Sequence, residues 1–79
     1  MREPSAARRG LDWLLSTHRT FEVVSVEWQE DGPWLLVTLG VQSDNPEAWV
    51  RYPWAVWRET GAVYGVHNGA VSDNPVHVP

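Results

Sequence analysis

The stretch at residues 50–66, VRYPWAVWRETGAVYGV, limits most strongly what this chain can fold into. Bulky apolar residues alternate with smaller or charged ones from Tyr52 and Trp54 onward, and a period of two places alternate side chains on opposite faces of a β-strand. Thr60 and Gly61 then predict a tight turn followed by a second strand. The sequence therefore predicts an antiparallel hairpin around which the other elements are arranged.

A helix is predicted upstream of this hairpin. Apolar residues recur every three or four positions as far as His18, which indicates an amphipathic helix of three to four turns. Pro4 suits the first turn, and Ser5 is an alternative N-cap. Gly10 weakens the helix by about 1 kcal/mol relative to alanine, so we expect the helix to depend on docking to a sheet.

The rest of the chain reads as short strands separated by turn residues. Pro53 indicates an edge strand or a bulge, and Asn68-Gly69 is typical of a type I′ hairpin turn. We predict a loop at Gln42–Glu47, where a proline follows Asp-Asn. The predicted strands are Thr20–Gln29, Trp34–Val41, Trp49–Arg58, Ala62–His67 and a brief fifth at Ala70–Ser72.

These elements predict an α+β fold with one N-terminal helix packed on a four- to five-stranded antiparallel meander sheet. Residues 1–72 form a single domain in this prediction, and residues 73–79 form a flexible C-terminal tail. The alternative is a small SH3-like β-barrel with an appended helix, whose aromatic residues line a cleft for a small apolar or cationic ligand.

Composition excludes several classes of function. The 79 residues contain ten acids, six arginines and no lysine, so the net charge of −4 argues against a nucleic-acid binder. We find no apolar run long enough to span a membrane and no secretion signal. The absence of cysteine removes thiol chemistry and disulfides, and it favours a cytoplasmic location.

No catalytic or metal-binding motif stands out. The three histidines, His18, His67 and His77, lack metal-ligand spacing, and we expect one at the helix end and two on the surface. The sequence contains no phosphate loop, nucleophile elbow or metalloprotease motif. We therefore predict a protein that is not an enzyme and binds no metal or cofactor.

Six tryptophans in so short a chain remain to be explained. The strand alternation predicts that Trp28, Tyr52 and Trp54 face the helix and form core. The opposite sheet face then carries an apolar patch of the kind that marks a partner surface, unless the sheet curls and buries these rings too. We predict that it binds a protein partner or a second copy of the chain. The predicted partner-binding residues are Trp34, Trp49, Arg51 and Trp57; Phe21 and Val23 are predicted on the same face.

The order of these features resembles two families of small domains. Trp54-Ala55-Val56 and Thr60-Gly61-Ala62-Val63 are similar to the later strands of PepSY-type domains. The resemblance to the gas vesicle accessory protein O family covers residues 6–66. The resemblance to PepSY-type domains implies inhibition or chaperoning of a protease, and the resemblance to the gas vesicle family implies assistance in assembling a protein shell. Both are interaction roles. The residues that resemble the second family are Ala6-Ala7-Arg8-Arg9, Val24-Ser25-Val26-Glu27, Asp31-Gly32 before Trp34, and the hairpin Val56–Val63.

Overall fold

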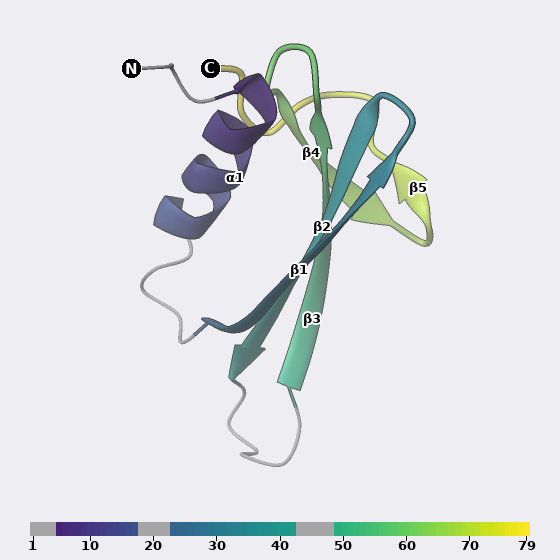
Figure 1. The fold of residues 1–79 in the computed structure, drawn as a ribbon. Coiled ribbons are helices and arrows are strands. Elements are labelled where there is room, and N and C mark those ends of the chain that lie inside the picture. Colours follow the sequence, from purple (N-terminus) through teal and green to yellow (C-terminus); the bar gives the residue numbers. More distant parts are fainter. Residues whose placement is uncertain (1–4, 18–22, 43–48) are drawn as a thin grey trace.

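The computed structural model describes residues 5–17, 23–42 and 49–79, and the side chain of Trp49 is not among the parts described (Figure 1). The predictions made for Pro4, His18, Phe21 and most of the loop at Gln42–Glu47 lie outside these residues. The elements are α1 (Ala6–Thr17), β1 (Val23–Asp31), β2 (Trp34–Gln42), β3 (Trp49–Trp57), β4 (Val63–His67) and β5 (Ala70–Val71).

The strands form an open antiparallel sheet in the order β1-β2-β3-β4-β5, with α1 on one face (Figure 1). This confirms the prediction of one helix on a meander sheet. The barrel alternative is wrong, because a closed barrel requires the first and last strands to pair, whereas β1 and β5 lie at opposite margins of this sheet.

The turn residues act as the sequence predicts. Asn68 and Gly69 have positive φ angles of 52° and 78°, the backbone that a type I′ turn requires between β4 and β5. The turn between β1 and β2 is tighter than predicted. Asp31 pairs with Trp34, which leaves only two residues to reverse the chain.

Helix α1 begins at a side-chain cap. The Ser5 hydroxyl accepts a hydrogen bond from the Arg8 backbone N–H at 3.2 Å, and the Ser5 carbonyl accepts the first helical bond from Arg9 at 3.1 Å. Ser5 is therefore the N-cap that the sequence offered as an alternative to a start at Pro4. This cap satisfies one of the backbone donors that the first helical turn leaves without a partner.

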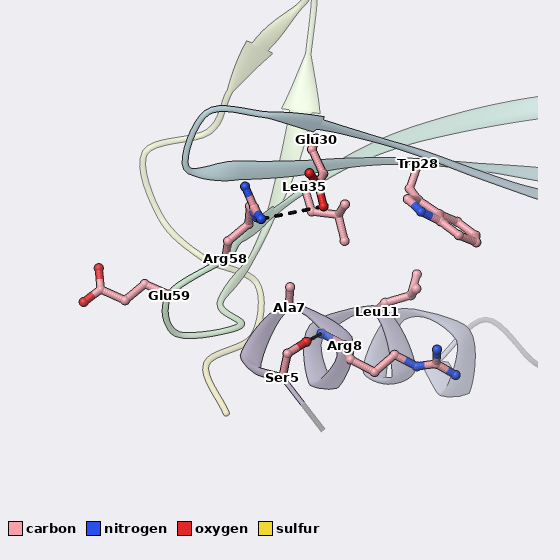
Figure 2. Close-up of a pocket in the computed structure, with 9 residues that line it drawn as sticks. All are labelled: Ser5, Ala7, Arg8, Leu11, Trp28, Glu30, Leu35, Arg58 and Glu59. Carbon is pink, nitrogen blue, oxygen red and sulfur yellow. Dashed lines mark hydrogen bonds and ion pairs between the residues drawn. The ribbon is translucent and has the colours of Figure 1, made fainter. Parts of the chain in front are cut away.

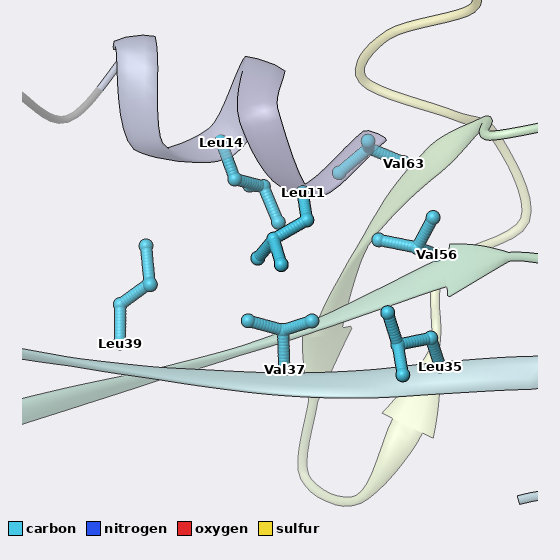
Figure 3. Packing of buried hydrophobic residues seen from close by; sticks show 7 residues of the cluster. All are labelled: Leu11, Leu14, Leu35, Val37, Leu39, Val56 and Val63. Carbon is cyan, nitrogen blue, oxygen red and sulfur yellow. The ribbon is translucent and has the colours of Figure 1, made fainter. Parts of the chain in front are cut away.

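The hydrophobic core lies between α1 and the central strands (Figure 3). Leu11 and Leu14 point from the helix toward the sheet, and Leu14 is completely buried. Alternate residues of β2 point back at them, as expected for a strand with one buried face. Trp54 and Val26 pack around this cluster. The buried cluster consists of Leu11, Leu14, Leu35, Val37, Leu39, Val56 and Val63.

Two of the rings predicted as core are on the helix side of the sheet but are exposed. Trp28 and Tyr52 lie opposite Val37 and Leu39 in the strand register, yet they are 62% and 46% exposed. The 12 residues of α1 span about 18 Å, whereas each nine-residue strand spans about 30 Å. One short helix cannot cover the whole face. Of the three rings predicted as core, only Trp54 packs against the buried cluster.

A bulge corrects the predicted register at the start of β1. The pairing shifts between Val23 and Ser25, so that Val23 lies opposite Val41 while Ser25 lies opposite Gly40. An extra residue in one strand moves the residues before it to the other face. Val23 therefore shares the face of the buried Val41, and the prediction that it projects from the open face is wrong.

Pro53 lies at an edge, as predicted. It is opposite Thr38 of β2, and β4 pairs with β3 only from Trp54 onward. Within the described residues, β3 thus has a neighbour on one side only at Pro53. A proline is tolerated there because its missing N–H removes no hydrogen bond between strands.

The C-terminal segment folds back along β4. The backbone N–H of Val76 donates to the Val63 carbonyl at 2.7 Å, and the Val63 N–H donates to the His77 carbonyl at 2.9 Å. The His77 ring stacks on Trp13 of α1 with centroids 4.3 Å apart and an interplanar angle of 7°. His77, expected on the surface, is half-buried. The sequence alone shows no sign of these contacts between residues 73–79 and the rest of the fold.

No helix in the described part of the chain has both the length and the apolar character needed to cross a membrane.

Gly10 allows α1 to approach the turn between β3 and β4 closely. A β-carbon at this position would lie 2.6 Å from Cγ1 of Val56 and 2.7 Å from the carbonyl oxygen of Gly61. Carbon atoms pack at about 3.5 to 4.0 Å, so no other residue fits without movement. A β-carbon on Gly61, whose φ is 80°, would lie even closer to the carbonyl oxygen of Ala6. The residue that weakens the isolated helix therefore permits its docking.

We expect Gly10→Ala to lower the free energy of unfolding by about 1 to 3 kcal/mol, because overpacking outweighs the gain in helix propensity. Urea denaturation followed by circular dichroism measures this change. Gly65→Ala is the matched control, because its β-carbon would lie 3.7 Å from Nε2 of His67, which is an ordinary van der Waals contact. We expect a change within about 0.5 kcal/mol for the control. Equal effects of the two substitutions would contradict the packing explanation.

The stack of His77 on Trp13 predicts a second stability effect. We expect His77→Ala to cost about 1 kcal/mol, the usual value of an aromatic pair beyond its buried area. Val78→Ala is the control, since Val78 is 63% exposed one residue away. Urea denaturation again gives the measurement, and a Val78 effect as large as that of His77 would show that the stack is not responsible.

Candidate interaction surfaces

An aromatic cluster lies on the sheet face opposite α1. Trp34 and Trp57 are directly opposite each other in β2 and β3, and their rings meet edge to face with centroids 4.9 Å apart. Tyr64 of β4 makes a second edge-to-face contact with Trp34 at 5.3 Å. All three side chains are half-buried. Such arrangements match the quadrupoles of the rings, so the cluster has a defined geometry. We call Trp34, Trp57 and Tyr64 the aromatic cluster.

Two hollows adjoin the aromatic cluster. The first, of about 510 Å³, is bordered by all three rings, and polar groups of Thr60 and Asp73 lie at its rim. The second, of about 550 Å³, shares Trp34 with the first and continues over Leu36 toward β1. Val71 of β5 lines both, because the hairpin of β4 and β5 lies on the side of the sheet away from the helix (Figure 1). Together the hollows offer apolar walls with polar rims.

The structure brings together only part of the predicted site. Trp34 and Trp57 are in contact, on the predicted face. Arg51 lies opposite Gly40, on the same face as Trp57 but several residues before it in β3, and is exposed. Trp49 lies opposite Gln42. Tyr64 is the residue that sequence reasoning missed, although its position opposite Ala55 follows once the hairpin register is extended into β4.

A third hollow lies on the other side of the sheet, between α1 and the hairpin of β1 and β2. It has a volume of about 490 Å³. Figure 2 shows Leu11 and Ala7 pointing into it from the helix, with Leu35 opposite and the Trp28 ring beside it. Because Trp28 is mostly exposed, this hollow leads from the surface to the margin of the core.

Arginines and carboxylates pair around this third hollow. Arg58 lies 3.6 Å from Glu30 and donates a hydrogen bond to the Gly32 carbonyl at 3.1 Å (Figure 2). On the helix, Arg8 pairs with Asp12 at 3.0 Å. These exposed pairs are worth little stability, about 0 to 1 kcal/mol each. Glu59 also lines this hollow, is exposed, and forms no ion pair with any residue that the structure describes.

Three carboxylates border the other two hollows. Glu27 and Asp31 line the second hollow, and Asp73 lines the first. None of the three forms an ion pair with any residue that the structure describes. Among the residues that the structure describes, the carboxylates at these two rims therefore keep a negative charge that no ion pair compensates.

The described ranges contain no group of three or more histidine, cysteine or acidic side chains that could hold a metal ion. His67 is at the end of β4 and exposed, and the His77 ring is engaged with Trp13. The groups that border the hollows on the two faces are mainly aromatic rings, aliphatic side chains and carboxylates.

Comparison of the chain with protein-family models, curated proteins and solved structures finds no match.

Because the rings of the aromatic cluster are half-buried, removal of one of them should lower the free energy of unfolding only moderately. We expect Trp57→Ala to lower the free energy of unfolding by about 1 to 3 kcal/mol, less than a fully buried tryptophan would cost. Trp28→Ala is the matched control and should cost less than about 1 kcal/mol, because that ring is mostly in water. Chemical denaturation compares the two variants. Complete unfolding of Trp57→Ala would show that this ring is core and not surface.

Proposed function

We propose that this protein is a non-catalytic interaction module that binds a protein partner through the sheet face opposite α1. The observation that carries the proposal is the aromatic cluster beside two open hollows, on the face that α1 does not cover. Tryptophan and tyrosine are among the residues that contribute most to binding energy at interfaces. Their rigid rings offer large contact areas at a low cost in conformational entropy.

The shape of the surface favours a polypeptide over a small molecule. Small-molecule sites usually enclose most of the ligand surface, whereas the two hollows are open and adjoin each other at Trp34. Each can accept one or two side chains of a partner. A sheet face of this kind also suits the area of about 800 Å² per partner that standard interfaces bury.

Self-association through the same face is a second form of this proposal. A two-fold dimer would place the aromatic cluster of one copy against that of the other. The families that the chain resembles in sequence have interaction roles as well, which agrees with a module that is not an enzyme. The cysteine-free composition remains our reason for proposing a cytoplasmic location.

The proposal is tested with substitutions on opposite faces. Photo-crosslinking from position 71, which borders both hollows, identifies partner candidates, and each candidate is then purified and titrated by calorimetry. We expect Trp57→Ala to weaken binding at least tenfold, as for a residue at the centre of an interface. Tyr52→Ala is the matched control, because it removes an exposed ring from the opposite face. It should change the affinity less than threefold.

Two results would contradict the proposal. One is equal binding by the wild type and a folded Trp57→Ala variant; the other is a loss of binding that Tyr52→Ala reproduces. Sedimentation equilibrium of the protein alone separates the two forms of the proposal, since only self-association through this face produces a dimer that Trp57→Ala dissociates.

A further inference from the structure

Strand β1 is a long, uncovered margin of the sheet. It pairs with β2 along one side, over the nine residues Val23–Asp31. The margin at β4 is covered by β5 and by the bridge between Val63 and His77. The open part of β3 contains Pro53, which cannot donate a backbone hydrogen bond to an added strand. Among the described strands, β1 alone combines length with the absence of such protection.

The side chains along the exposed half of β1 differ between its two faces. Glu27 and Asp31 lie opposite Thr38 and Trp34, which places both carboxylates on the face away from the helix. Trp28 lies on the helix side. Both carboxylates are exposed and form no ion pair within the described residues. A strand placed beside β1 would meet negative charge on one face.

On its other face the same added strand would meet apolar surface. The hollow of about 490 Å³ between α1 and β1 opens beside Trp28, and Leu11 of the helix and Leu35 of the sheet face each other across it (Figure 2). Glu30, the other residue on this side in the exposed half of β1, is already paired with Arg58 at 3.6 Å. The helix side therefore calls for an apolar side chain, and the opposite side calls for a cation.

We propose that β1 binds an extended segment of a protein partner, added as a sixth strand, in which basic and apolar residues alternate. Backbone hydrogen bonds to the free margin supply affinity, and alternate side chains supply specificity. Directly opposite residues of neighbouring strands have β-carbons about 4.5 to 5.5 Å apart, so arginine or lysine can pair with Glu27 and Asp31. The apolar residue between them reaches the hollow beside Trp28. This inference rests on the proposed function only in taking the partner to be a polypeptide.

The acidic half of β1 is a poor match for the same half of a second copy. Antiparallel pairing of two β1 strands about Gln29 would set Glu27 of each copy against Asp31 of the other. Like charges directly opposite each other destabilise a strand pair, and acidic residues on an edge strand oppose self-pairing. The charge of the margin therefore selects a basic segment over a copy of itself.

A synthetic nonapeptide of alternating arginine and valine is the probe. Titration into the isotopically labelled protein, followed by amide chemical shifts and hydrogen exchange, should show protection of backbone amides in β1. A peptide of the same composition with its arginines and valines in separate blocks is the probe control. We expect it to bind at least tenfold more weakly, because it cannot place charge on one face and apolar residues on the other.

Charge-neutralising variants test the contacts. Glu27→Gln combined with Asp31→Asn should weaken binding of the alternating peptide at least tenfold. Asp73→Asn is the control, since it removes an exposed carboxylate that forms no ion pair with the described residues and lies beside the first hollow, away from β1; it should change the affinity less than twofold. Amide spectra of each variant verify that the fold is intact.

Three results would overturn the proposal: equal affinity for the two peptides, equal effects of the Asp73 and β1 variants, or β1 amides that remain unprotected at saturation. A dimer of the free protein that buries β1 would also overturn it. None of these results bears on the affinity loss caused by Trp57→Ala, so failure at the β1 margin and failure at the aromatic cluster are distinguishable.

Discussion

The docking of α1 onto β2, β3 and β4 is the interaction on which the rest of the structure depends. Leu11 and Leu14 complete a core that the sheet cannot form alone, because an antiparallel sheet of this size must bury one face. The approach is close enough that Gly10 meets Val56 and the turn at Gly61 directly. A chain of 79 residues has little core to spare, so this contact carries a large share of the stability.

The same helix also explains which surfaces stay open. It is shorter than the strands and lies closest to β3, so the helix side near β1 keeps a hollow and an exposed Trp28. The C-terminal segment extends the covered region on the other side, through the stack of His77 on Trp13 and the bridge to Val63. One margin of the sheet is thereby closed and the other remains available.

Charge and aromatic rings are distributed to match this asymmetry. The aromatic cluster lies on the sheet face away from α1, and the hollows that adjoin it are bordered by carboxylates that form no ion pair within the described ranges. On the helix side, Arg8 pairs with Asp12 and Arg58 pairs with Glu30, whereas Arg51 lies on the same face as the aromatic cluster. These rings and carboxylates are the features on which we base the proposal of a partner that brings cations to aromatic and acidic contacts.

Local patterns in the sequence were sufficient for the elements and their order. The period-two alternation around Trp54, the Asn68-Gly69 turn and the edge position of Pro53 all depend on near neighbours, and the structure confirms them. The common face of Trp34 and Trp57 follows from the same alternation, whereas their position directly opposite each other is set by the strand register. Tyr64 could have been added by carrying the register across one more turn.

What the sequence by itself determined is therefore the set of strands, the helix and the sheet face of the tryptophans in the first three strands; Val23 is an exception, because a bulge displaced it. Tertiary structure alone decided how much of each face is covered, because coverage depends on the length and position of α1 and on a C-terminal segment that returns from far along the chain. Trp28 and Tyr52 share a face with the core yet remain in water for this reason. The period of the sequence specifies the sheet face toward which a side chain points. Burial of that side chain requires another element to cover it, and the covering elements here are distant in sequence.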